Sequence, residues 1–190
     1  MKHRLAVFAS GTGSNFEAIA DACVDGRLDA EVVLMVCDKP EAAVVGKAAS
    51  RGIDSFVFKP KDYACKADYE REILALLDSK GVELVCLAGY MRIVSDVLLD
   101  AYAGRIINIH PSLLPSFRGA HAVEQAVAFG VKVYGITIHY VTSELDGGRI
   151  IAQRAFEYEG SDPEEVHRIG QKIEHALYVE TIDKLLKQYE

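Results

Sequence analysis

Arg105–Pro115 reads RIINIHPSLLP, and this stretch predicts a buried strand that ends in a polar site. Its isoleucines favour a strand, because β-branched apolar side chains pack well on a pleated sheet. Asn108 and His110 interrupt the apolar run two positions apart, so both side chains should leave the same face. Pro111 lacks a backbone N–H and favours an extended residue before it, which should end the strand at His110. The sequence thus predicts an amide beside an imidazole at the carboxyl end of a buried strand.

The pair of Asn108 and His110 has an ordinary and a functional interpretation. A single polar residue on a buried strand is more often a hydrogen-bonded core residue than a catalyst. Two of them followed by the rigid loop Pro111–Pro115 favour function, since catalytic residues concentrate in loops that a rigid scaffold positions. In open α/β sheets, ligands also bind beyond the carboxyl ends of the strands. We therefore treat the pair as candidate catalytic residues.

The length and charge of the chain limit its class. Its 190 residues favour one domain, and a hydrophobic content of 50% is enough for a substantial core. The net charge of -7 argues against nucleic-acid binding, which needs a basic surface, so local donors would have to hold any anionic ligand. The apolar run Leu5–Ala9 is too short for a signal peptide or a membrane span. We therefore expect a soluble cytoplasmic protein that binds no membrane.

The cysteines lack the paired spacing of a metal site. Their scattered positions suit buried free thiols in a reducing compartment, and we expect no metal. The four residues are Cys23, Cys37, Cys65 and Cys86.

A glycine-rich turn, Ser10–Asn15, follows the first predicted strand and precedes a predicted helix over Phe16–Ala22. Such a turn points backbone N–H groups at an anion, and glycines let the backbone approach it closely. Ser14 and Asn15 are expected to cap the helix. The G-x-G-x-x-G motif fails because Phe16 replaces its third glycine, and the P-loop's Gly-Lys-Ser/Thr is absent. The turn favours a single phosphate over a pyrophosphate; an ordinary glycine turn with a helix cap is the alternative.

Strands and helices alternate up to residue 110, which predicts right-handed crossovers and a doubly wound, mostly parallel α/β sheet. The expected strands before Arg105 are Leu5–Ala9, Glu31–Cys37, Ser55–Phe58 and Val82–Ala88. The expected helices are Phe16–Ala22, Ala42–Ser50, Asp68–Lys80 and Ser95–Tyr102.

The pattern changes in the second half of the chain. A predicted helix over Ala122–Phe129 precedes two long strands, Lys132–Val141 and Ile150–Tyr158. The short glycine turn Leu145–Arg149 joins these strands, so we expect an antiparallel pair at one side of the sheet. A long C-terminal helix is expected over Glu164–Gln188.

Two polar features of this half stay open on the residues alone. Asp146 lies in the glycine turn, where Asp-Gly is common for backbone reasons without any role in function. Gln171, Glu174 and Tyr178 share one face of the last helix. They could line the rim of a pocket, but a solvated flank is the simpler interpretation.

Four stretches together resemble the folate-dependent formyltransferases, and the resemblance runs from end to end of the chain. They are Ser10–Asn15, Gly89–Arg92, Asn108–Pro115 and Leu145–Gly148. The resemblance implies a Rossmann-like fold and transfer of a formyl group from 10-formyltetrahydrofolate, without a metal. The Gly-Ser-Asn loop resembles the branch of the family that formylates the primary amine of glycinamide ribonucleotide in purine biosynthesis. Such an enzyme would bind small molecules only, as a monomer or homodimer.

The resemblance also implies roles for particular residues. The implied catalytic residues are Asn108, His110 and Asp146, and the implied cradle for the ribose phosphate is Gly13, Ser14 and Asn15. The implied substrate contacts on the last helix are Gln171 and Glu174. The implied folate contacts, beside Asn108 and Asp146, are Lys66, Met91, Arg92, Ile93, Val94, Thr142, Ser143, Glu144 and Leu145.

The resemblance divides the domain 1–190 into a phosphate-binding half, 1–104, and a catalytic and folate-binding half, 105–190. It also makes a cis Leu114–Pro115 bond plausible. The chain departs from the family pattern at Arg149 and Val179, where many relatives have proline. Both positions flank the implied site.

Three competing interpretations are weaker. Formyltransferases that act on methionyl-tRNA carry an added RNA-binding domain and a basic surface, and formyltetrahydrofolate hydrolases carry an added N-terminal regulatory domain. We expect neither the RNA-binding domain, which is C-terminal in those relatives, nor a basic surface here. The first predicted strand begins by residue 5, so we expect no N-terminal regulatory domain. A non-catalytic dinucleotide-binding module is the alternative from another class, because Asp38 follows the second strand where a ribose contact would lie. The missing third glycine weakens it.

Overall fold

The structure is a computed structural model and describes residues 2–188. Over these residues the chain forms one seven-stranded sheet in the order β3-β2-β1-β4-β5-β6-β7. The strands are β1 (His3–Phe8), β2 (Ala30–Cys37), β3 (Ser55–Val57), β4 (Leu84–Leu87), β5 (Ile106–His110), β6 (Val133–Tyr140) and β7 (Ile150–Glu157). The helices are α1 (Ser14–Val24), α2 (Ala43–Ser50), α3 (Lys66–Ser79), α4 (Asp96–Ala101), α5 (Ala122–Phe129) and α6 (Pro163–Leu186), with a 3-10 turn at Pro60–Asp62.

The first five strands are parallel, and β6 runs antiparallel to both β5 and β7. The predicted α/β class, the antiparallel pair and the long C-terminal helix are all confirmed. The chain starts at β1, builds β2 and β3 on one side, and then crosses to β4 on the other. This reversal between β1 and β4 opens a crevice beyond the carboxyl ends of the strands, where ligands bind in such sheets.

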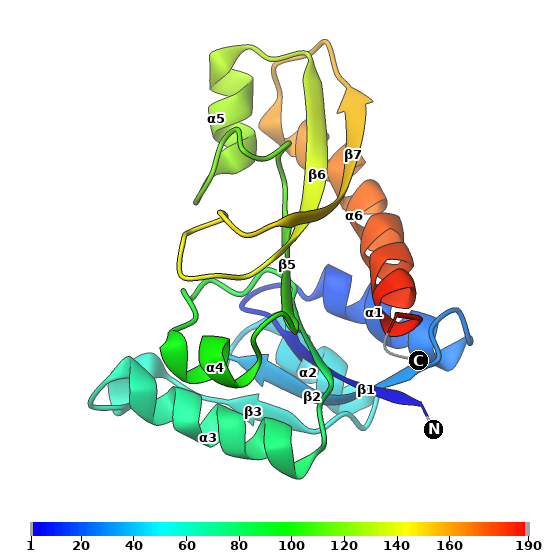
Figure 1. Cartoon of the computed structure of the whole chain (residues 1–190). Helices are drawn as coiled ribbons and strands as arrows, with labels where there is room; N and C mark the ends of the chain where they lie inside the picture. The colour runs from blue at the N-terminus through cyan, green and yellow to red at the C-terminus, as the bar shows by residue number, and fades with distance from the viewer. Residues whose placement is uncertain (1, 189–190) are drawn as a thin grey trace.

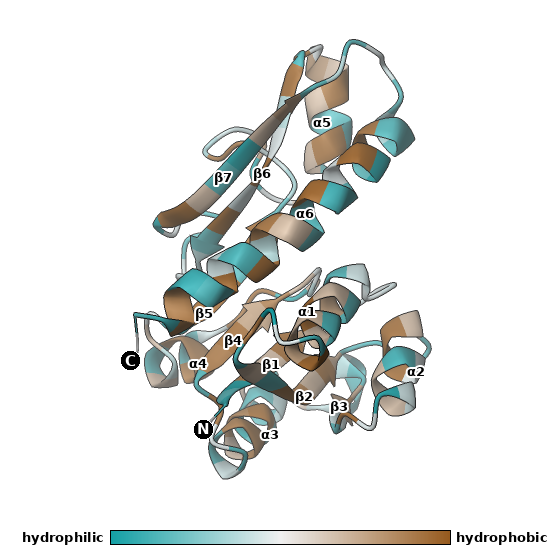
Figure 2. Ribbon diagram, turned by 90° about the vertical axis from the view of Figure 1, so that its right-hand side faces the viewer, coloured by the Kyte–Doolittle hydropathy of each residue, from teal (hydrophilic) through white to brown (hydrophobic). Residues whose placement is uncertain are grey.

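Two apolar cores cover the two faces of the parallel strands. Alternate residues of β1 show the division, since Leu5 and Val7 join the core under α1, α2 and α6, whereas Ala6 and Phe8 join the core under α3 and α4. Figure 1 shows α3 and α4 on one side of the sheet and α1 and α6 on the other. The strand β4 and the part of β1 after Arg4 are apolar (Figure 2), because helices cover them on both faces.

The antiparallel pair β6–β7 extends beyond the parallel strands together with α5 (Figure 1). Helix α6 runs along this pair and back to α1, and contacts both. A third small core, which includes Val123, Tyr134 and Val166, joins α5 to β6 and α6. The two parts of the sheet therefore share one long helix, and the carboxyl end of β5 lies where they meet.

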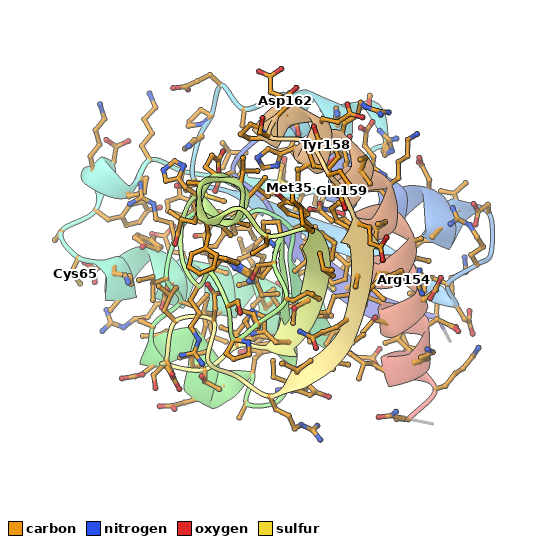
Figure 3. All side chains as sticks on the ribbon, turned by 90° about the horizontal axis from the view of Figure 1, so that it is seen from above. Met35, Cys65, Arg154, Tyr158, Glu159 and Asp162 are labelled. Carbon is orange, nitrogen blue, oxygen red and sulfur yellow. The ribbon has the colours of Figure 1, made fainter. Side chains whose placement is uncertain are left out.

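Two local predictions were wrong. Ser14 and Asn15 do not cap α1; the cap position belongs to Gly13 in the left-handed conformation, with φ of 75°. A Cβ at Gly13 would lie 2.5 Å from Val44 Cγ2, so glycine is required there. The cysteines are free thiols as expected, but Cys65 is exposed at the start of α3, at the edge of the molecule (Figure 3). Cys65 directly precedes the first residue of α3, and the spacing of the four cysteines in the sequence gave no indication that this one is exposed.

Among residues 2–188, no helix combines the length and the apolar content needed to cross a lipid bilayer.

Candidate functional site

A cavity of about 650 Å³ lies at the carboxyl ends of β4 and β5. Loops supply most of its wall: the segment after β4, the segment after the His-Pro turn, and the β6–β7 connection. Helix α6 adds Glu174. The volume is in the range of pockets that bind small molecules and cofactors.

Asn108, His110 and Asp146 meet at this cavity, as predicted for residues far apart in the chain. His110 Nδ1 lies 3.5 Å from Asp146 Oδ2. Asn108 Nδ2 lies 3.2 Å from His139 Nε2, which in turn lies 3.5 Å from Asp146 Oδ1. The four side chains therefore form a continuous polar chain around the carboxylate.

The hydrogen bonds of His110 restrict its protonation state. Its Nε2 lies 2.8 Å from the carbonyl oxygen of Phe117, which can only accept, so this nitrogen carries a proton. Its Nδ1 faces the carboxylate of Asp146, which is also an acceptor. Both ring nitrogens of His110 therefore face acceptors, and only a ring that carries a proton on each nitrogen could donate to both.

The contacts of Asp146 favour its ionised carboxylate. Its backbone has φ of 49° and its side chain is 9% exposed, so the turn directs the carboxylate inward. The backbone N–H of Gly119 donates to Oδ2 at 2.8 Å. The hydrogen bond from His139, with the Gly119 N–H and the nearby His110, lowers the pKa of Asp146 from an ordinary 3.8 to about 2. Asp146 is thus ionised throughout the physiological pH range.

The lowered pKa of Asp146 predicts a loss of stability in acid. A carboxyl whose pKa falls on folding stabilises the native state above its unfolded pKa, and this contribution disappears as pH falls through the folded value. The relevant window runs from 3.8 down to about 2. We expect about 2 kcal/mol to be lost across it, at about 1.4 kcal/mol per pKa unit. Urea unfolding of wild type and Asp146→Asn should show the stability difference shrinking from pH 5 to pH 2; a constant difference would contradict the assignment.

The helix α1 and the helix α6 meet at the other end of the cavity. Asn15 Nδ2 donates to Glu174 Oε2 at 2.8 Å, and both residues line the cavity. Gln171 Nε2 donates to Ser14 Oγ at 3.0 Å, outside the cavity lining. Gln171 and Glu174 are therefore not a plain solvated flank. Because no side chain caps α1, the first N–H groups after Gly13 stay free of side-chain partners.

The segment after β4 forms the second wall. Met91, Arg92, Ile93 and Val94 all line the cavity, and Met91 and Ile93 are 66% and 58% exposed. Lys66 does not line it; its ammonium donates to the carbonyl oxygen of Ile93 at 2.9 Å. The four predicted folate-binding residues of this segment thus lie together at the cavity, and Lys66 binds the backbone of one of them, Ile93.

The β6–β7 connection closes the third side. Thr142, Glu144, Leu145 and Asp146 line the cavity, whereas Ser143 is exposed outside it. The Glu144 carboxylate pairs with Arg118 from the loop after β5. This ion pair joins two of the three walls at the surface.

A family model described as formyl transferase matches residues 3–182. The chain belongs to the formyl transferase family. It is 51% identical over 184 residues to the phosphoribosylglycinamide formyltransferase of Bacillus subtilis, a match that covers 96% of this chain and 94% of that protein. It is 39% identical over 180 residues to the human trifunctional purine biosynthetic protein adenosine-3, of whose length it spans 18%.

Solved structures give the same result. The crystal structure of glycinamide ribonucleotide transformylase 1 from Geobacillus kaustophilus superposes with a TM-score of 0.95 at 47% identity, covering 98% of this chain and 100% of that one. That of phosphoribosylglycinamide formyltransferase from Bacillus halodurans gives 0.94 at 48% identity, covering 98% and 97%. The predicted family and fold are confirmed, and the chain is a formyltransferase enzyme.

Sequence reasoning missed one member of this formyl transferase's site. His139 on β6 is 2% exposed and lies opposite Asn108 in the antiparallel register. Its Nδ1 faces the carbonyl oxygen of Tyr140 at 2.9 Å, which leaves Nε2 to contact both Asn108 and Asp146. Its place in a strand of alternating residues gave no signal, because its partner depends on how β5 and β6 pair.

The loop after His110 is fixed by a buried threonine. Thr137 is fully buried; its Oγ1 donates to the Ser112 carbonyl oxygen at 2.7 Å and accepts the Leu114 N–H at 3.1 Å. Gln153 donates to the Leu114 carbonyl oxygen at 2.9 Å. The Leu114–Pro115 bond is cis, as the resemblance suggested. The two strands of the antiparallel pair therefore hold the loop that carries His110 and Phe117.

The two departures from the family pattern are accommodated. The Arg149 guanidinium lies 5.0 Å from the centre of the Tyr140 ring. Val179 is 6% exposed and belongs to the main core. Neither residue lines the cavity, although Tyr178 beside Val179 donates to the Leu87 carbonyl oxygen at 2.9 Å.

Proposed function

We propose that this enzyme transfers the formyl group of 10-formyltetrahydrofolate to the primary amine of glycinamide ribonucleotide. The observation that carries the proposal is the meeting of Asn108, His110 and Asp146 at one end of a cavity that also reaches Asn15 and Glu174. The cavity thus offers the three candidate catalytic side chains, together with different wall segments that two small molecules could contact.

In the reaction, the amine nitrogen attacks the formyl carbon, and the bond from that carbon to the folate nitrogen breaks. Negative charge develops on the formyl oxygen in between. The Asn108 amide can donate an N–H to this oxygen without a change of protonation. A protonated His110 can donate to it as well once one of its two N–H groups turns from its present acceptor, the Phe117 carbonyl oxygen or the Asp146 carboxylate, to the formyl oxygen. A side-chain donor aimed at such an oxygen typically contributes about 3–4 kcal/mol of transition-state stabilisation.

The net proton transfer runs from the attacking amine to the departing folate nitrogen. His110 is the residue proposed to supply the proton, since an imidazole exchanges protons near neutral pH. Asp146 orients its ring and stabilises the imidazolium, and it could order a water that carries the amine's proton. The nucleophile is the amine of the substrate, so the proposal needs no nucleophilic side chain.

The phosphate end of the substrate is assigned to Gly13, Ser14 and Asn15 in the half 1–104. The support is the uncapped start of α1, where free N–H groups and the helix dipole favour an anion. The substrate contact of the half 105–190 is Glu174, which Asn15 orients. The Oδ1 of Asn15 is buried and accepts no hydrogen bond from the described residues, so it suits a donor group of the ligand.

The folate is assigned to the two walls with exposed apolar side chains. Met91, Ile93 and Leu145 are 66%, 58% and 53% exposed, and an extended aromatic ligand would cover them. Backbone groups of Met91–Val94 and of Thr142–Asp146 can form hydrogen bonds with the polar edge of the folate ring. In this scheme the folate contacts draw on both halves of the chain.

The first experiment is an assay of formyl transfer to glycinamide ribonucleotide. The same assay without the amine, with formate release as the readout, tests for a hydrolase. A titration with nicotinamide dinucleotide tests the non-catalytic module. That module is disfavoured because both carboxylate oxygens of Asp38 already accept from Ser10 and Arg92. Dinucleotide binding without formyl transfer would contradict the proposal.

A substrate without its phosphate should react more slowly as well as bind more weakly. Holding two small molecules in attack geometry can supply about 7–11 kcal/mol, and the remote phosphate contributes binding energy to that orientation. We expect kcat at saturating dephosphorylated substrate to fall by about tenfold, while the KM for the folate stays the same. Steady-state kinetics with both substrates measures this; an unchanged kcat would show that the phosphate serves affinity alone.

A further inference from the structure

A buried carboxylate, that of Asp38, binds the segment Met91–Val94, to which we assign the folate. Asp38 follows β2, and its side chain is 1% exposed. Arg92 Nε donates to Asp38 Oδ2 at 2.8 Å. Ser10 Oγ donates to Asp38 Oδ1 at 2.5 Å, and Ser10 Oγ in turn accepts the backbone N–H of Met91 at 2.9 Å. We refer to Ser10, Asp38, Met91 and Arg92 as the Asp38 network.

The position of the Asp38 network follows from the strand order. Ser10 lies just past β1, Asp38 just past β2 and Arg92 past β4, and these three strands are neighbours in the order β2-β1-β4. Arg92 thus reaches across the end of β1 to a carboxylate on the far side. This is the point where the topology reverses, so one short network ties the start of the phosphate loop to the folate segment.

The buried members of the network stand behind the cavity. Ser10 and Asp38 are each 3% exposed, and neither belongs to the cavity lining, whereas Met91 and Arg92 both do. Asp38 therefore cannot touch a ligand in the cavity except through its partners. A carboxylate buried this deeply also needs its charged partner, because a lone buried charge is costly.

The segment Met91–Val94 has further anchors at its other end. Lys66 holds the carbonyl oxygen of Ile93, and the buried Glu70 carboxylate accepts from the Ser95 N–H at 3.0 Å. These contacts fix the end of the segment toward α4. The contacts through Asp38 fix the beginning, at Met91 and Arg92.

We propose that Asp38 is a positioning residue for the folate: it holds Arg92 and, through Ser10, the backbone of Met91 in the arrangement that binds the donor. The inference rests on the proposed function, because it assigns the folate to the segment Met91–Val94. Removing the carboxylate should loosen this wall and weaken folate binding. The phosphate end, which the Asp38 carboxylate does not contact directly, should bind its substrate as before.

The test compares full-length wild type with Asp38→Asn. We expect the KM for 10-formyltetrahydrofolate to rise about tenfold, the scale of losing one hydrogen bond to a charged group. The KM for glycinamide ribonucleotide should stay within about twofold, and the Kd of tetrahydrofolate measured by calorimetry should rise with the folate KM. Asp54→Asn is the matched control, because it removes an ion pair to Lys80 on the exposed surface by the same chemical change.

A double-mutant cycle separates positioning from direct contact. Arg92→Gln should raise the folate KM about as much as Asp38→Asn, and the double variant should be no worse than either, because all three break one linkage. Multiplied effects, near a hundredfold, would show that Asp38 and Arg92 act independently of each other and would overturn the role of Asp38. Ser10→Ala provides a second route should Asp38→Asn fail to fold; it should raise the folate KM by a smaller factor.

The outcomes are distinct. An unchanged folate KM in Asp38→Asn and Ser10→Ala, or equal rises of both KM values with a lower melting temperature, would show a structural role only and refute the inference. Wild type that transfers formyl groups and binds tetrahydrofolate upholds the proposed function whatever the variants do. Wild type that does neither would refute the proposed function, and this inference with it.

Discussion

Replacing His110 by alanine should lower kcat by about 10²–10⁴-fold, the range that a positioned acid or base contributes. The residue is buried, with Phe117 and Asp146 as acceptors on its two sides. His139 has a similar pair of acceptors in Tyr140 and Asp146, but the proposed mechanism gives the proton transfer to His110, so without it the proton for the departing folate nitrogen would have to come from water. Steady-state kinetics at saturating concentrations of both substrates measures the change.

The same variant should bind the folate almost as well as wild type. The cavity wall that we assign to the folate is formed by Met91–Val94 and Thr142–Asp146, and His110 adds only its edge. We expect the Kd of tetrahydrofolate to change by less than about threefold, which is under 1 kcal/mol. His3→Ala is the matched control, since His3 pairs with Glu83 at the opposite, amino end of β1. A kcat within tenfold of wild type would remove His110 from the mechanism.

The fold could be predicted from local patterns because the chain alternates elements in a regular way. Apolar runs such as Glu31–Cys37 become strands covered on both faces, and the alternation in Lys132–Val141 becomes β6. The start of α6 agrees with its capping sequence, because the Asp162 side chain accepts a hydrogen bond from the Glu164 N–H. At α1 the signal misled, since Gly13 takes the cap and frees Ser14 and Asn15 for α6.

The candidate site could be predicted only in part, because its contacts cross between elements. The pattern of β5 placed Asn108 beside His110, but their connection through His139 depends on the register of β5 against β6. The pairing of Asn15 with Glu174 spans 159 residues. From the residues alone, Glu174 lay on a flank of a helix that could equally face solvent. Such contacts follow from tertiary packing, which no single stretch of sequence encodes.

Asp38 shows that tertiary contacts can also remove a ligand-binding role that the sequence suggests. Its position after β2 suggested a ribose contact in a dinucleotide module, which is a reasonable inference from the strand order. In the structure the carboxylate is buried and accepts from Ser10 and Arg92 instead. The residue that decides this is Arg92, which lies 54 positions away in the chain and comes from the segment after β4. One basic side chain from a neighbouring strand end thus changes a ligand contact into an internal support.

Replacing Asn108 by alanine should lower kcat by about 10²–10³-fold, the effect of removing one donor to a developing oxyanion. Its Nδ2 lies 3.2 Å from His139 Nε2, a single atom that can engage at most one of the two N–H groups of the amide. The amide has a second N–H, and the residue is half-buried at the cavity wall, so this proton is available to the formyl oxygen.

The variant Asn108→Asp tests whether donation is the role of Asn108. It has nearly the same shape, but its carboxylate can only accept, and its charge would repel the developing oxyanion. We therefore expect Asn108→Asp to be at least as impaired in kcat as Asn108→Ala, with melting temperatures close to wild type in both. His139→Asn, which disturbs the support of the amide but not the donor itself, should reduce kcat by a smaller factor. Near-normal turnover in Asn108→Asp would mean that the oxyanion is stabilised elsewhere, because a residue of the right size but without a donor would then be sufficient.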